Sequence, residues 1–170
     1  MTLLLPHPVL HGLLDAQENF DALASQRPEI TNAPARAHLA SAQSIGTGSS
    51  KVPLDTEDFD PAGCFDAANH RYVVPADGYY ATHGAVAADL NNLTVQTWIA
   101  FVFLNGAEAC RGGRVAVRGG VAGDLWDMVV AGVVECSAGD TLELWAFNNG
   151  PNSTALETVG STFLSVVRVA

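Results

Sequence analysis

Two different patterns of apolar residues divide the chain. Between Pro8 and Arg27, apolar side chains recur at steps of three and four residues, which is the spacing of one stripe on an α-helix. Beyond residue 37, short runs rich in Val, Thr and aromatic residues alternate with Gly, Asn, Asp and Pro, as in β-strands joined by turns. The sequence therefore predicts an N-terminal arm over residues 1–36 and an all-β head domain over residues 37–170.

The arm is predicted to hold a short α-helix over about residues 8–27, followed by a linker over residues 29–37. Pro8 suits a first helical position, where its missing N–H leaves no bond unmade, and Pro28 ends the helix. A helix of this length is marginal in water by itself, so we expect it to dock on its own head domain or on another protein. Its apolar stripe supplies the candidate anchoring residues, which are Val9, Leu13, Phe20 and Leu23.

The head domain is predicted to contain many short strands and no helix. The expected strands cover residues 71–74, 95–104, 114–117, 127–134, 141–147 and 162–169. Turn-forming pairs such as Asn105-Gly106 separate them, and this arrangement favours a sandwich or a barrel. Residues 98–104 and 128–134 are apolar on both sides, as expected of a sheet that faces the core and a neighbouring subunit.

The composition of the chain argues against several classes of function. A net charge of −10 with a single lysine, Lys51, argues against nucleic acid as a partner, because no basic cluster is available to meet phosphates. Hydrophobic residues make up 48% of the chain and charged residues only 15%, so we expect some apolar surface to be buried between copies. No apolar run approaches the roughly 18–20 residues of a membrane span. The N-terminal segment, interrupted by Pro6 and Pro8, is not expected to be a signal peptide.

Little in the sequence indicates catalysis. It contains no nucleophile elbow, P-loop or dinucleotide fingerprint, so we expect neither an enzyme nor a bound cofactor. Cys64, Cys110 and Cys136 lack the short spacings of a zinc site. Two of them pair in a disulfide, or all three stay as buried thiols, and the sequence leaves both alternatives open.

Three further groups of side chains are candidates for contacts. The acidic segment 55–60 holds either calcium ligands or solvated charges at a strand edge, and its spacing favours the second. Arg111, Arg114 and Arg118 are interpreted first as solvated residues of a hairpin loop and second as a contact for a carboxylate. Among the tryptophans, Trp98 and Trp145 lie in apolar strands and are expected in the core, whereas Trp126 follows a loop and is the candidate exposed contact.

One ordered set of residues carries a family resemblance. It comprises Leu54, Asp60, Phe65, Tyr72, Gly78 and Tyr80. This spacing resembles the signature of the complement-q globular head, in the tumour necrosis factor-like superfamily, although Thr82 and Gly84 stand where the pattern has aromatics. Residues 137–144 and 161–164 resemble two further strands of that family. The resemblance implies a jelly-roll sandwich that assembles as a threefold homotrimer with one sheet around the axis. The candidate axis residues are Tyr80, Thr82, Phe163 and Ser165.

A second resemblance concerns the arm. Residues 13–24 resemble the opening segments of small phage virion proteins. We therefore expect a structural protein of a phage particle, either a capsid decoration, a head fibre or a tail spike. It would be made in the bacterial host cytoplasm and exposed on the virion surface. Its expected partners are other virion proteins, bound through the arm, and a host surface glycan. The alternative is a soluble bacterial complement-q-like binding module, an adhesin or lectin without a virion.

Overall fold

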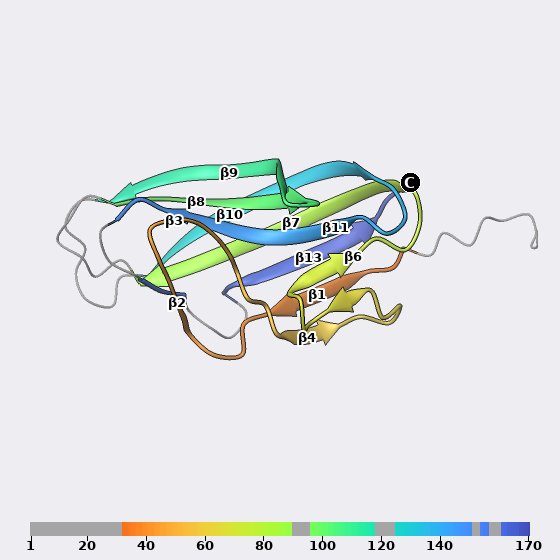
Figure 1. The fold of residues 1–170 in the computed structure, drawn as a ribbon, viewed down its shortest axis with the longest axis horizontal. Coiled ribbons are helices and arrows are strands. Elements are labelled where there is room, and N and C mark those ends of the chain that lie inside the picture. Colours follow the sequence, from red (N-terminus) through yellow and green to blue (C-terminus); the bar gives the residue numbers. More distant parts are fainter. Residues whose placement is uncertain (1–31, 90–95, 118–124, 151–153, 157–160) are drawn as a thin grey trace, which may run out of the picture. The chain divides into compact units, whose positions relative to one another are not determined.

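The computed structural model describes residues 32–89, 96–117, 125–150, 154–156 and 161–170 (Figure 1). Asn32–Ala170 forms a compact unit of the chain. The helix expected over residues 8–27, with the anchoring residues Val9, Leu13, Phe20 and Leu23, lies outside the described residues. Arg118 also lies outside them.

The described residues are rich in strands and contain no helix. The first strands are short: β1 (Ala35–His38), β2 (Gln43–Ile45), β3 (Gly48–Lys51), β4 (Thr56–Phe59), β5 (Phe65–Asp66) and β6 (Arg71–Val73). The later strands include the long ones: β7 (Gly78–Asp89), β8 (Gln96–Leu104), β9 (Ala107–Val117), β10 (Leu125–Cys136), β11 (Thr141–Asn148), β12 (Thr154–Leu156) and β13 (Phe163–Arg168).

These strands form two antiparallel sheets that pack face to face. Sheet A has the order β4-β1-β13-β7-β10, with β12 and β2 added beside one end of β7. Sheet B has the order β5-β6-β11-β8-β9, with β3 also paired to β11. Several neighbours, such as β1 and β13 or β6 and β11, come from distant parts of the sequence, so these connections cross between the sheets, as in a jelly roll. Figure 1 shows β8, β9 and β11 of sheet B running alongside β7, β10 and β13 of sheet A.

The core lies between the two sheets. Strand residues alternate between the two faces of a sheet, and in β10 residues 128, 130, 134 and 136 are buried whereas residues 129, 131, 133 and 135 are exposed. Sheet B contributes Trp98, Val102 and Leu144, which meet Met128 and Leu164 of sheet A. Trp98 is fully buried, and its indole N–H donates to the Gln96 side-chain oxygen at 3.2 Å. The sequence-based expectation that Trp98 belongs to the core is confirmed, whereas Trp145, expected there as well, is only partly buried and lies outside the core.

Most of the strands expected from the sequence are present with shifted ends. The run over residues 114–117 is the last part of a longer strand, β9, which begins at Ala107. Arg111 and Arg114 therefore lie in a strand, and their assignment to a loop was wrong. Strand β1 begins at Ala35, inside the stretch expected to be a linker. Strand β7 was not expected as a strand, although it is central in sheet A.

The three cysteines are free thiols. Cys64 and Cys136 are buried, and Cys110 is partly buried. Burial raises the pKa of the Cys136 thiol to about 11 and raises the pKa of Cys64 above its usual value. Of the alternatives left open by the sequence, the structure has the unpaired thiols. In the part of the chain that the structure describes, no helix has the length and hydrophobicity needed to cross a membrane.

Candidate functional site

The candidate site is the outer face of sheet A, meaning the side of this sheet that points away from the core. Because Met128, Val130 and Val134 of β10 point into the core, the alternate residues Val129, Ala131 and Val133 point outward. The pairing register extends this assignment to β7, β13 and β1. The outer face comprises Val129, Ala131 and Val133 of β10, Tyr79, Ala81 and His83 of β7, Phe163, Ser165 and Val167 of β13, and Pro34, Arg36, His38, Asp58 and Phe59 at β1 and β4.

This face leaves large apolar side chains in contact with water. Val133 is 63% exposed, Val129 47%, Tyr79 47% and Phe59 48%. Because they are spread across β10, β7 and β4, the apolar surface extends over the width of the sheet. Contiguous apolar surface of this kind is uncommon on a soluble monomer and marks a place where another molecule packs.

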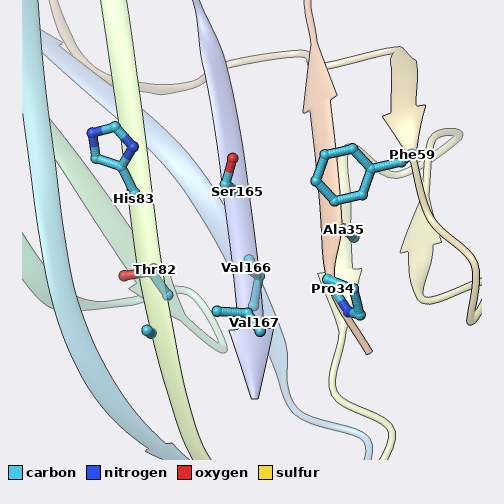
Figure 2. Close-up of a pocket in the computed structure, with 9 residues that line it drawn as sticks. Pro34, Ala35, Phe59, Thr82, His83, Ser165, Val166 and Val167 are labelled. Atoms are coloured by element: carbon cyan, nitrogen blue, oxygen red, sulfur yellow. The ribbon is translucent and has the colours of Figure 1, made fainter. Parts of the chain in front are cut away.

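A hollow of about 240 Å³ lies in this face. Figure 2 shows that its lining residues come from β7, β13, β1 and the neighbouring Phe59 of β4. The lining consists of Pro34, Ala35, Phe59, Ala81, Thr82, His83, Ser165, Val166 and Val167. Apart from His83, Thr82 and Ser165 these are apolar side chains, so the hollow suits an apolar group of a partner.

Polar groups on this face are paired with one another around Phe163. The Arg36 guanidinium lies over the Phe163 ring, 4.3 Å from its centroid, and the His83 ring meets Phe163 edge-on at 5.2 Å. Asp58 lies beside both residues on β1, with its oxygens at ion-pair distance: 3.3 Å from Arg36 Nε and 2.9 Å from His38 Nδ1. A partner that covers the face therefore meets charges that already have a counter-charge, which lowers the desolvation penalty.

The outer face of sheet B differs, because its aromatic side chains cover one another. Phe103 and Trp145 stack with 4.6 Å between ring centroids, and the Arg111 guanidinium lies over Phe101. Glu143 accepts from Trp145 Nε1 at 2.8 Å and from Lys51 Nζ at 2.7 Å. Residues 98–104 are thus apolar on both sides because one side of β8 packs in the core and the other carries these aromatic side chains. Only the second expected run, residues 128–134, leaves its outward apolar residues exposed.

The four candidate axis residues do not share one face. Phe163 and Ser165 lie on the outer face of sheet A. Tyr80 is fully buried and points into the core, where its ring lies 6.1 Å from that of Tyr72. Its hydroxyl donates to the Ala76 carbonyl at 2.7 Å, and burial raises the pKa of this phenol. The assignment of Tyr80 to an outward surface is therefore corrected.

Thr82 has the same orientation along β7 as Tyr80. It is 3% exposed, and its hydroxyl donates to the Gly132 carbonyl at 3.3 Å. The register explains both placements: Ser165 pairs with His83, and Phe163 pairs with Ala85. Residues of β7 with odd numbers therefore share the face of Phe163 and Ser165, and those with even numbers turn inward. Ala81 and His83, which sequence reasoning missed, take the places expected of Tyr80 and Thr82.

The remaining candidate residues lie elsewhere. Trp126 is 43% exposed at the start of β10, and its role as a contact stays a prediction. In the acidic segment, Asp60 accepts from the Phe65 N–H and Asp55 from the Ala40 N–H. Among the described residues, no group of three or more His, Cys, Asp or Glu side chains gathers as a metal site. Arg111 pairs with Glu108, so the carboxylate that it meets belongs to its own strand.

Solved structures with the same fold are found, whereas neither a protein-family model nor a curated protein matches the sequence. The globular domain of a zebrafish complement 1qA protein aligns with a TM-score of 0.54 at 7% identity, over 82% of this chain and 98% of that chain. Murine APRIL aligns with a TM-score of 0.55 at 16% identity, over 80% and 98%. The Eiger tumour necrosis factor of S. frugiperda aligns with a TM-score of 0.48 at 16% identity, over 81% of this chain and 94% of that chain. The chain is thus similar in fold to the complement 1qA globular domain and to APRIL.

Proposed function

We propose that this protein is a non-enzymatic structural protein whose head assembles as a homotrimer through the outer face of sheet A. The observation that carries the proposal is the row of exposed apolar side chains from Val133 to Phe59, beside an apolar hollow. Fully burying a valine or phenylalanine side chain contributes roughly 1.5–3 kcal/mol, so contact between copies at this face is favourable. The number three rests on the resemblance to complement-q and tumour necrosis factor-like domains.

Mass photometry or light scattering of the purified chain tests the assembly. We expect a particle of three times the 17.8 kDa chain mass. Val133→Asp places a charge on the face at a side chain that is 63% exposed, so it should dissociate the assembly without unfolding the head. Ala109→Asp adds the same charge on an exposed position of β9 and serves as the matched control. A wild-type particle with the mass of one chain would contradict the proposal.

We further infer that the head belongs to a phage particle, as a capsid decoration, head fibre or tail spike on the virion surface. The support is the layout of arm, linker and head in the sequence, together with the resemblance of residues 13–24 to virion proteins. In this arrangement Val9, Leu13, Phe20 and Leu23 bind other virion proteins, and the head is free to contact a host surface glycan. The protein is made in the bacterial host cytoplasm and leaves it with the particle.

Deletion of residues 1–30 tests the virion role. The shortened protein should remain trimeric, because the proposed assembly face lies within residues 34–167. Particles produced with the shortened protein should lack it, as measured by mass spectrometry of purified virions. Particles that retain it in normal amount would rule out the arm as the anchor. Cleavage of a polysaccharide by the purified protein would contradict the non-enzymatic assignment.

A soluble binding module, such as an adhesin or lectin, is the second candidate, and the exposed indole of Trp126 favours it. Tryptophan combines a large flat apolar surface with an N–H donor, which suits contact with a ligand that is partly apolar. Glycan-array binding by the wild-type protein that is lost in Trp126→Ala would support this function. Absence of binding in both proteins would leave the virion role as the preferred one.

A further inference from the structure

His83 occupies a central position on the outer face of sheet A. Strand β7 is paired on both sides, so that His83 stands opposite Ser165 of β13 and Ala131 of β10. Its side chain is exposed in the single chain and helps to line the hollow (Figure 2). If copies meet on this face, the imidazole moves from water into a largely apolar contact. Burial favours the neutral ring over the imidazolium, because the charged form loses its hydration.

The charged groups around His83 do not supply a counter-charge for an imidazolium. On β1 and β4, Asp58 already faces Arg36 and His38. On β10, Asp127 and Glu135 are each four residues from Ala131, which is about 13 Å along a strand. Strand β13 presents uncharged residues to this face, and β7 adds Tyr79. Among the described residues, no ion pair joins His83 to a carboxylate.

The ring of Phe163 adds a second reason why a protonated His83 is unfavourable on this face. It meets His83 edge-on and already carries the Arg36 guanidinium over its ring. A protonated His83 would place a second cation beside the same ring. Repulsion between the two cations grows when water is removed, because the effective dielectric constant falls.

We propose that His83 makes the assembly sensitive to acid, so that copies associate at neutral pH and separate under mildly acidic conditions. This inference rests on the proposed trimer and on its use of the outer face of sheet A. Histidine side chains ordinarily titrate near pH 6.5. The assembled form contains the neutral His83 ring. The association constant is therefore largest above that pH and decreases as the pH falls below it, because His83 of the free chain then binds a proton that assembly has to remove. Because three copies each carry one His83, the trimerisation constant falls by up to about a thousandfold per pH unit.

The test compares the mass of the particle at pH 8.0 and pH 5.5 at one ionic strength, for wild type, His83→Gln and His38→Gln. Wild type should be trimeric at pH 8.0 and largely monomeric at pH 5.5 at micromolar concentration, with an unchanged circular dichroism spectrum. His83→Gln keeps a polar side chain that does not titrate and should stay trimeric at both values. His38→Gln should respond to pH as wild type does, because His38 already faces Asp58.

The possible results separate this inference from the function on which it rests. A wild-type trimer that persists at pH 5.5, or a His83→Gln protein that dissociates as wild type does, overturns the inference and leaves the trimer in place. A wild-type monomer at pH 8.0 overturns both. The proton resonances of the His83 ring give a second readout that does not depend on the Gln variant. Their midpoint should lie at least one pH unit lower in concentrated wild type than in monomeric Val133→Asp, and equal midpoints overturn the inference.

Discussion

Gly112 of β9 lies directly against the carbonyl oxygen of Val129 of β10, so that a Cβ atom at residue 112 would collide with this oxygen. The same Cβ would come within 3.1 Å of the Ala100 carbonyl oxygen. β9 and β10 are edge strands of the two sheets, so this contact closes one side of the sandwich. Only a residue without a side chain allows the two backbones to approach this closely.

Gly112→Ala should therefore destabilise the head by about 2 kcal/mol, because backbone atoms on both sides have to move. Urea denaturation at a fixed protein concentration measures the change as a lower midpoint with an unchanged slope. Gly113→Ala is the matched control, since a Cβ at that position meets no atom within 4 Å. Equal midpoints for the two variants would show that β9 and β10 are not held together in this way.

Removal of the Tyr72 hydroxyl should also lower stability. This hydroxyl donates to the Ala33 carbonyl at 2.8 Å in the core and fixes the residues just before β1. Tyr72→Phe leaves the buried carbonyl without its donor, and we expect a loss of about 1–2 kcal/mol in the free energy of unfolding. Tyr79→Phe removes a hydroxyl from a side chain that is 47% exposed and should change little. A loss of similar size in both variants would argue against the Tyr72–Ala33 bond.

The three thiols should react at different rates with a disulfide reagent in the native protein. Cys64 and Cys136 are buried with a raised pKa, so little thiolate is present and access is poor. Cys110 is partly exposed on β9 and should react first at pH 8. The Cys110→Ser variant should lose the fast phase in a thiol assay, whereas all thiols should react quickly in denaturant. A fast phase that survives in Cys110→Ser would contradict this order.

Asp140 should make the head less stable in acid. The hydrogen bond from the Asn105 side chain, followed by that from the Ser137 N–H, holds the pKa of Asp140 below its usual range. A carboxyl with a depressed pKa in the folded state stabilises the fold above the ordinary value near 4, and this contribution disappears as the pH falls through the lowered value. Asp140→Asn should lower the urea midpoint at pH 7 and lose most of this difference at pH 2–3.

Asn105→Ala provides the control for that measurement. It removes the partner of Asp140 and should reproduce part of the loss at pH 7. In the double variant the two losses should be less than additive, because both residues belong to one network. Full additivity would mean that the two side chains act independently.

The sequence predicts the fold better than it predicts the site. Runs rich in β-branched and aromatic residues, such as residues 127–134 and 141–147, are predicted as strands from their β-propensity, and turn residues mark where they end. Strand β7 is not predicted in this way, because most of its residues are Ala, Gly, Thr or His. Its extended form is imposed by pairing with β10 on one edge and with β13 on the other.

The outer face of sheet A could not be predicted from the sequence either, because it also depends on how the strands pair. Which residues of β7 point outward depends on the register with β13, and a shift of one residue exchanges the two faces. The sequence predicts Tyr80 and Ser165 on one axis surface, whereas in the structure Ser165 pairs with His83 and Tyr80 points into the core. The exposure of Val133 and Phe59 likewise depends on strand order, because β4 and β10 lie at opposite edges of the sheet and are far apart in sequence.

The position of β13 has a consequence for how the chain folds during synthesis. β13 comes last among the described strands, yet it lies between β1 and β7, whose other partners are formed by earlier residues. Until residues 163–168 leave the ribosome, a nascent chain holds β1 and β7 with unsatisfied backbone groups facing each other. Such open edges pair readily with those of other incomplete chains. Completion of sheet A therefore waits for its final described strand.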